Sequence, residues 1–255
     1  MILTELFDGY TPALVLLVSM VFLLAGVVKG VVGLGLPTIS MALLSIFMAP
    51  AHAAALLVIP SLVTNVWQTR PFSSLMPLLQ RIGGMQAGVV AGTLAGAVVL
   101  GAPAGAWAAM SLGVALLAYS AWAMFGRPFT VPAQTERWLG PIVGALTGFI
   151  TAATGVFVVP AVPYLQSLGL ARDELIQAMG VSFTVSTVAL AAGLWLNDSY
   201  SFGTAGASLF MLAPALAGMA AGTRLRHSLA PSVFRRCFLV SLAVVGVYLF
   251  AKGWL

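Results

Sequence analysis

Long apolar runs follow one another along almost the whole chain, and this pattern most limits what the chain can fold into. An apolar helix of about 20 residues crosses the hydrocarbon core of a bilayer. In lipid, each backbone N–H and C=O group needs a partner within the protein, so runs of this length indicate helices. The predicted long spans are Pro12–Lys29, His52–Gln68, Gly84–Gly101, Gly105–Phe125, Trp138–Thr151, Glu174–Leu196, Thr204–Gly222 and Arg236–Phe250.

Composition supports the same fold class. Of the 255 residues, 61% are hydrophobic and only 7% are charged, whereas a soluble domain carries about 25% charged residues. We therefore predict an all-α membrane protein with about eight to ten membrane segments. The single cysteine, Cys237, excludes a disulfide framework. We expect the lipid bilayer as a partner, with no metal, no cofactor and no nucleic acid.

Two shorter apolar runs, Thr38–Met48 and Val156–Leu168, each follow a break in the pattern. The first break reads GVVGLGLP from Gly30 to Pro37, and the second reads TAATG from Thr151 to Gly155. Glycine and proline interrupt helical hydrogen bonding. At membrane depth, such backbone is tolerated only where protein buries it or where it lines a water-filled cavity. Each break with its short run is therefore predicted to form a broken helical hairpin.

Three short matches in one order indicate an internal duplication. GVVKGVVGLGLP at 26–37 is similar to GFITAATGVFVVP at 148–160, and GVVAGT at 88–93 is similar to GMAAGT at 218–223. Between them, IPSLVTN at 59–65 lies opposite GVSFTVS at 180–186. We predict a first repeat at 1–126, a cytoplasmic linker at 127–137 and a second repeat at 138–255.

Charge placement predicts how the two repeats are oriented. Nine of the eleven basic residues lie in four segments, which the positive-inside rule assigns to the cytoplasm. Each repeat then contains a broken hairpin plus three transmembrane helices, so the repeats are inverted and both termini lie outside the inner (plasma) membrane. Inverted repeats with broken helices are typical of secondary transporters. The nine residues are Arg70, Arg81, Arg127, Arg137, Arg172, Arg224, Arg226, Arg235 and Arg236.

Two blocks of the chain resemble a known family. The segment GVVKGVVGLGLPTISMALLSIFMAPAHAAALLVIPSLVTNVWQ, from Gly26 to Gln68, resembles the first block of the TauE/SafE-type sulfite exporters. LTGFITAATGVFVVPAVPYLQSLGL, followed by AMGVSF, is similar to their second block, although its break is poorer in glycine. The resemblance implies a membrane exporter of small sulfur-containing anions such as sulfite, sulfoacetate or related sulfonates. Transport of another small organic anion is the alternative.

Lys29 is the residue that most directly suggests a binding site. It ends the first predicted span, just before the first break. A buried ammonium in a membrane is costly and usually functional, whereas a lysine near a helix end can instead extend its head to the interface. Helix N-termini after the breaks, expected at Thr38 and Val156, would add partial positive charge for an anion. For Thr38, ordinary helix capping is the alternative.

Neutral donors near the breaks complete the predicted site. Ser61, Thr64, Asn65 and Gln68 lie at helical spacings of three and four, and Ser182, Ser186 and Thr187 occupy similar positions in the second repeat. Their alternative role is to hold helices together by hydrogen bonds. The predicted substrate-binding residues are Lys29, Gly33, Gly35, Thr38, Ser40, Asn65, Gln68, Thr154, Ser182 and Ser186.

Two further patterns concern packing and chemistry. The series Gly88/Gly92/Gly96 and Gly140/Gly144/Gly148 predict close helix packing, either within one chain or in a homodimer. All six acidic residues lie in loops or at span ends, which predicts transport without a buried titrating carboxylate. Nucleophile and phosphate-binding motifs are missing from the sequence. We therefore predict that the chain is not an enzyme. A non-transport intramembrane enzyme or a scaffold is the less favoured alternative.

Overall fold

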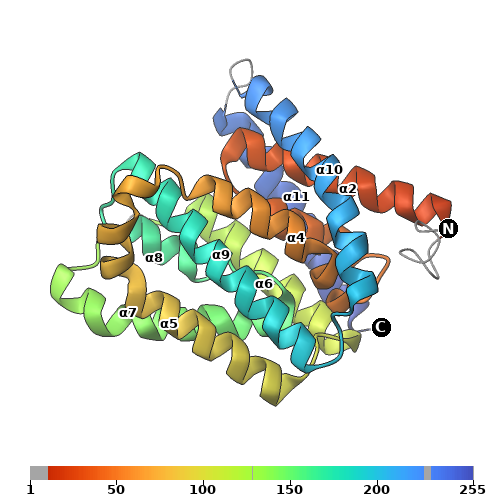
Figure 1. The fold of residues 1–255 in the computed structure, drawn as a ribbon, viewed down its shortest axis with the longest axis horizontal. Helices are drawn as coiled ribbons and strands as arrows, with labels where there is room; N and C mark the ends of the chain where they lie inside the picture. The colour runs from red at the N-terminus through yellow and green to blue at the C-terminus, as the bar shows by residue number, and fades with distance from the viewer. Residues whose placement is uncertain (1–10, 128, 227–230, 255) are drawn as a thin grey trace.

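A computed structural model describes residues 11–127, 129–226 and 231–254, and every regular element in these ranges is a helix (Figure 1). This confirms the predicted all-α class. The N-terminal segment that is predicted to lie on the outer side of the membrane contains Glu5 and Asp8, and these two residues are not among the described ones. The elements are α2 (Pro12–Val32), α3 (Leu36–Leu44), α4 (Pro50–Gln68), the 3-10 turn η1 (Phe72–Ser74), α5 (Leu75–Leu100), α6 (Gly105–Phe125), α7 (Ala133–Thr154), α8 (Ala161–Ser167), α9 (Arg172–Leu196), α10 (Phe202–Leu225) and α11 (Pro231–Lys252).

Seven of the described helical segments are long and apolar enough to cross a membrane. The 22-residue helix α7 is not among the seven, although its apolar part, Trp138–Thr151, was also predicted as a span. The chain is therefore a multi-pass membrane protein. The seven segments are Pro12–Val32, Pro50–Gln68, Phe72–Leu100, Gly105–Phe125, Arg172–Leu196, Phe202–Leu225 and Val233–Lys252.

Several helices begin earlier than their apolar runs. Helix α5 starts at Leu75 rather than Gly84, and α11 starts at Pro231 rather than Arg236. Hydropathy marks only the part of a helix that lies in hydrocarbon. Polar and basic residues such as Arg81 continue the same helix beyond it, because long unbranched side chains favour helix and extend their charged heads toward water.

Both predicted breaks are present, and they end their helices in the same way. Gly33 follows α2 with φ +83°, and its N–H donates to the carbonyl of Lys29 at 2.7 Å. Gly155 follows α7 with φ +69°, and its N–H donates to the carbonyl of Thr151 at 2.7 Å. A left-handed residue after the last turn is the usual glycine helix cap. The helices before the two breaks thus end with equivalent backbone geometry.

The predicted helix starts after the breaks are wrong by a few residues. Helix α3 begins at Leu36, so Thr38 is its third residue, because Pro37 fits the first turn of a helix. Helix α8 begins only at Ala161, and residues 156–159 are not helical. A residue before a proline is disfavoured in helical geometry, and Val159 precedes Pro160. Val156 is therefore not a helix start.

Two pairs of helices approach one another very closely, at opposite ends of the molecule. Figure 1 shows α5 beside α7 at one end and α2 crossing α10 at the other. A Cβ atom at Gly92 on α5 would overlap the carbonyl group of Ala145 on α7. A Cβ atom at Gly222 on α10 would likewise overlap the carbonyl group of Val27 on α2. Glycine is therefore needed at both contacts.

The two predicted glycine series face each other within the chain. Gly88, Gly92 and Gly96 on α5 pack on α7, while Gly144 and Gly148 on α7 pack on α5. Of the two packing alternatives, the contact within one chain is the one observed. A homodimer stays a prediction and would use other surfaces.

Helix pairing is compatible with two inverted repeats. Helices α4 and α9 pack together, as do α6 and α11. In the two predicted repeats, α2 to α6 are matched in order with α7 to α11, so that α2 matches α7 and α10 matches α5. The contact of α2 with α10 in the structure then has its counterpart in the contact of α7 with α5. The α4–α9 and α6–α11 contacts each join two matched helices. The boundaries of the repeats at 1–126 and 138–255 stay a prediction.

A hydroxyl group from α10 completes the hydrogen bonding of α4. Pro60 lies inside α4 and has no N–H for the carbonyl of Leu56. The hydroxyl of Ser208 donates to that carbonyl at 2.8 Å and accepts from the N–H of Ile59 at 3.0 Å. This contact fixes α10 against α4 just before the polar stripe that begins at Ser61.

Candidate functional site

The ammonium group of Lys29 is enclosed within the helix bundle. Lys29 is only 5% exposed, and its Nζ donates to Oγ1 of Thr64 at 3.1 Å and to Oδ1 of Asn65. The lysine head therefore does not extend to the surface. Among the described residues, no carboxylate forms an ion pair with Lys29. A buried cation that has only neutral partners is an unusual arrangement, because isolated charge is costly to bury.

From Asn65 the hydrogen bonds continue into the second half of the chain. Asn65 Nδ2 donates to Oγ of Ser61 at 2.9 Å, and Ser61 Oγ lies 3.1 Å from Oγ1 of Thr187 on α9. All of these side chains are buried. We call Lys29, Thr64, Asn65, Ser61 and Thr187 the Lys29 network; it joins α2, α4 and α9.

Helix ends determine where the Lys29 network lies. Lys29 is one turn before Gly33, and Asn65 is one turn before the end of α4 at Gln68. Gly180 on α9 lets this part of α4 approach, since a Cβ atom there would lie 3.0 Å from the carbonyl carbon of Gln68. The network is thus closer to the ends of α2 and α4 that the arginine pattern predicts to be cytoplasmic.

Two predicted site residues, Lys29 and Asn65, are therefore brought together. Three residues of the network, Ser61, Thr64 and Thr187, were not among the predicted binding residues. The signal for them was present, because Ser61 and Thr64 share the stripe of Asn65. This signal is weak for serine and threonine, because their hydroxyl groups also hold membrane helices together without binding a substrate.

Ser182 and Ser186 are buried on another face of α9. At about 100° per residue, they are rotated by about 140° and 100° from Thr187. Their hydroxyl groups have no partner among the described residues. Gln68 also stays out of the network, because its Nε2 donates to the carbonyl of Ile176 at 3.2 Å.

Helix α3 and the residue that follows it, Ser45, carry a second set of buried hydroxyl groups. Thr38, Ser40 and Ser45 are each at most 3% exposed, and none of their hydroxyls has a partner among the described residues. Thr38 and Ser45 share a helix face with Met41, which contacts the second break: a Cβ atom at Gly155 would lie 2.8 Å from Met41 Cε. Unpaired buried hydroxyls are costly unless something binds them.

Thr154, the remaining predicted residue, caps the second break. Its Oγ1 accepts from the N–H of Val156 at 3.1 Å and donates to the carbonyl of Ile150 at 2.6 Å. Gly33 and Gly35 form the first break, with φ of +83° and +109°. Within the described ranges, no three His, Cys, Asp or Glu side chains are grouped to hold a metal ion.

The comparison with protein families matches almost the whole chain. The sequence model described as sulfite exporter TauE/SafE matches residues 18–249, which include both breaks and the whole Lys29 network. The chain belongs to this family. The predicted resemblance is thereby confirmed over nearly the full length. Searches of curated proteins and of solved structures found no match.

Membership in the TauE/SafE family establishes the general class of function. The chain is a transmembrane transporter of a family described as sulfite exporters. A transporter role is consistent with the predicted absence of catalysis. The Lys29 network is the part of this TauE/SafE protein that combines buried positive charge with several neutral hydrogen-bonding groups.

Proposed function

We propose that this chain exports small sulfur-containing anions, such as sulfite, sulfoacetate or related sulfonates, by alternating access around the Lys29 network. The observation that carries the proposal is the burial of the Lys29 ammonium against Thr64 and Asn65, with no carboxylate to neutralise it among the described residues. An anion beside Nζ offsets the cost of that buried charge, which an uncharged or cationic substrate cannot do.

Each partner of Lys29 has a suitable role when an anion binds. The hydroxyl of Thr64 already donates to the carbonyl of Pro60 at 2.7 Å, so it orients a lone pair toward Nζ. The Asn65 amide can turn to present its N–H groups to a sulfonate oxygen, and the Ser61 hydroxyl accepts from it in the present arrangement. Sulfonate oxygens would thus replace the oxygens of Thr64 and Asn65 as acceptors, while the Lys29 ammonium stays in place.

The positions of the carboxylates support transport that needs no coupling ion. Glu136 is paired with Arg81, and Glu174 accepts from the N–H of Ala171 at 3.0 Å at the start of α9. Asp173 and Asp198 are exposed at the two ends of that helix. Moving an anion out of a negative cell interior is favourable by about 2.3 kcal/mol per charge per 100 mV. A uniporter or an anion exchanger is therefore sufficient.

The proposed orientation places both termini outside the plasma membrane and the arginine-bearing loops inside. It follows from the positive-inside rule, and the helix order of the described residues is compatible with it. In this orientation the end of α2 that carries Lys29 and the end of α4 that carries Asn65 lie toward the cytoplasm. Export would then begin at the side of the membrane closer to the Lys29 network.

Efflux from liposomes that contain only this protein tests the proposed function. Radiolabelled sulfoacetate is loaded inside, and a potassium gradient with valinomycin sets the potential. We expect efflux that saturates, speeds up when the interior is negative, and is inhibited by sulfite.

Malonate is the matched control substrate, because it replaces only the sulfonate group of sulfoacetate by a carboxylate. Efflux of malonate at the rate of sulfoacetate would favour a general organic-anion transporter. Absence of efflux for every sulfur anion from correctly folded protein would overturn the proposal.

A further inference from the structure

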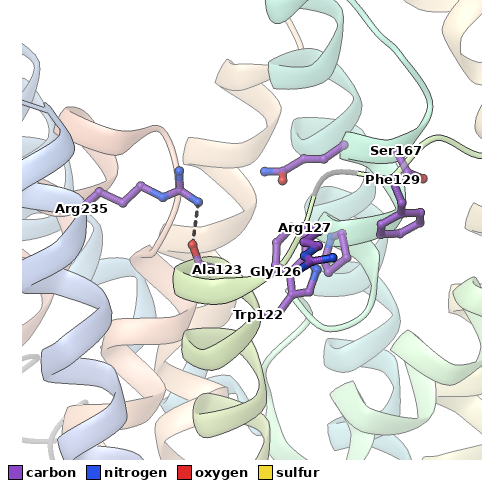
Figure 2. A pocket seen from close by; sticks show the side chains of 9 residues that line it. Trp122, Ala123, Gly126, Arg127, Phe129, Ser167 and Arg235 are labelled. Atoms are coloured by element: carbon purple, nitrogen blue, oxygen red, sulfur yellow. Dashed lines mark hydrogen bonds between the residues drawn. The ribbon is translucent and has the colours of Figure 1, made fainter.

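A polar cavity lies apart from the Lys29 network. It has a volume of about 320 Å³ and lies between the end of α6, helix α8 with the segment before α7, and the first turns of α11 (Figure 2). Pockets of roughly 300–1,000 Å³ hold small molecules, so the cavity suits a small ligand. Its lining includes Trp122, Arg127, Phe129, Gln166, Ser167 and Arg235.

Two arginines from distant parts of the sequence line this cavity. Figure 2 shows Arg127 beside Trp122, and Arg235 extending across from α11 to the end of α6. Among the described residues, neither guanidinium group is paired with a carboxylate. Two unpaired guanidinium groups make the cavity electropositive, and their planar forks fit the oxygens of sulfonates and phosphates.

Carbonyl groups at the end of α6 would oppose an anion if they were free. Two of them already have donors: the carbonyl of Trp122 accepts from the N–H of Gly126 at 2.7 Å, and the carbonyl of Ala123 accepts from Arg235 Nη2 at 3.3 Å. Arg235 donates through Nη2 in this contact, and its other N–H groups have no hydrogen-bond partner among the described residues. The balance of charge in the cavity is therefore positive.

The opposite wall of the cavity is held in place by hydrogen bonds. The N–H of Val131 donates to the carbonyl of Ser167 at 3.0 Å, which holds Val131 against the end of α8. Arg81 donates to the carbonyl of Leu168 at 2.7 Å and also pairs with Glu136. Glu136 is thus engaged elsewhere, and α8 provides Gln166 and Ser167 from a fixed position.

We propose that this cavity is a second anion site, which takes a small oxyanion of the sulfonate or phosphate type through Arg127 and Arg235. Trp122 and Phe129 give it an aromatic wall for a short organic group. Both arginines lie in segments that the positive-inside rule assigns to the cytoplasm, so the site collects the transported anion before it reaches the Lys29 network. The identity of that anion rests on the proposed function; the binding of an oxyanion does not.

Binding to purified protein in a non-ionic detergent tests the site without transport. The probes are sulfoacetate and inorganic phosphate, followed by calorimetry. Arg127→Gln combined with Arg235→Gln should weaken this binding by at least about tenfold. These titrations are made on a Lys29→Ala background, because the cavity is then the remaining proposed anion site. Arg224→Gln is the matched control, because this exposed arginine in the last turn of α10 does not line the cavity.

Nanodiscs distinguish a free anion from the headgroup of a lipid, since both carry the same oxyanion chemistry. Binding of sulfoacetate should persist when the zwitterionic lipid is replaced by phosphatidylglycerol. If sulfoacetate binds in zwitterionic lipid but not in phosphatidylglycerol, the cavity holds a lipid headgroup. This result would overturn the proposal that the cavity collects the transported anion. On the Lys29→Ala background, unchanged affinity in the double arginine variant would overturn the site itself. If liposomes show no sulfoacetate efflux but the arginine variants still lose oxyanion binding, the proposed function fails and this site stands.

Discussion

The hydroxyl oxygens of Ser61 and Thr187 lie 3.1 Å apart and join α4 to α9. Ser61 also accepts from Asn65, which in turn accepts from Lys29. The buried ammonium of the first half is therefore connected, through two side chains, to a helix of the second half. Any movement of α9 relative to α4 has to break or re-form this bond.

Ser61→Ala and Thr187→Val should each lower the free energy of unfolding by about 1 kcal/mol, because each leaves a buried polar group without its partner. The loss of unfolding free energy in the double variant should be smaller than the sum of the two single losses. The second substitution removes the hydroxyl group that the first one left without its partner. Unfolding in SDS from mixed micelles measures all three. Ser241→Ala is the control: its exposed hydroxyl bonds only to the carbonyl of Cys237 in its own helix. Strict additivity would contradict the bond.

Gly92→Ala should destabilise the protein by about 1–3 kcal/mol or more, because its Cβ would meet the backbone of α7. Gly83 lies in the same helix, and a Cβ atom added there would have nothing within 4 Å. Gly83→Ala should therefore be neutral or stabilising by up to about 1 kcal/mol, since alanine favours helix. Thermal unfolding of the two variants in one detergent gives the comparison. Equal stability of the two would argue against close packing of α5 on α7.

The sequence predicted those parts of the fold that depend on local properties of the chain. Apolar runs predicted the long helices, and glycine with proline predicted both breaks, because each reports a local property of the backbone. Helix starts such as Ala161 were missed, since the restriction that Pro160 places on Val159 outweighed an apolar run that looked helical.

The candidate site was predicted only in part, for a different reason. Lys29 stands out in the sequence because charge inside an apolar run is rare. Thr187 does not, since a threonine in a helix is ordinary. Its distance to Ser61 depends on how α9 is rotated against α4. That rotation is set by the close approach at Gly180, a contact between segments far apart in the sequence. Periodicity within one helix holds no information about it.

Replacing the acidic residues one at a time should leave transport intact. The variants are Glu136→Gln, Asp173→Asn, Glu174→Gln and Asp198→Asn, and each should retain sulfoacetate efflux within about twofold. Glu136→Gln should be the least stable of the four, because Arg81 loses the carboxylate that it contacts at 2.7 and 2.9 Å. A folded variant with no efflux would identify a coupling carboxylate and contradict ion-independent transport.

Single cysteines introduced on a Cys237→Ala background should report the orientation of the chain. A membrane-impermeant maleimide added outside should label cysteines at Glu5 and Ser199, and should miss those at Leu75, Pro132 and Leu229. Glu5 and Leu229 lie outside the described residues, so the structure adds nothing to the expectation there. Strong labelling at position 132 from outside would contradict the inverted arrangement, because 127–137 is the predicted cytoplasmic linker.

Lys29 should supply the fixed positive charge of the Lys29 network. Lys29→Ala should remove most binding at this site and abolish efflux, while binding at the cavity of Arg127 and Arg235 continues. Lys29→Arg should also bind poorly, because a larger planar group replaces a compact ammonium in a place that Thr64 and Asn65 fill.

A purely structural role for Lys29 predicts a different pattern. Removing the ammonium should then destabilise the helix bundle, because Thr64 and Asn65 lose their shared donor, and it should leave transport unchanged. Efflux and calorimetric titration of sulfoacetate, each made on a background that also carries Arg127→Gln and Arg235→Gln, separate the two roles. On that background, unchanged sulfoacetate affinity after Lys29→Ala would exclude Lys29 from the substrate site. Affinity lost in Lys29→Ala and still low in Lys29→Arg would require both the charge and the compact shape of lysine at this position.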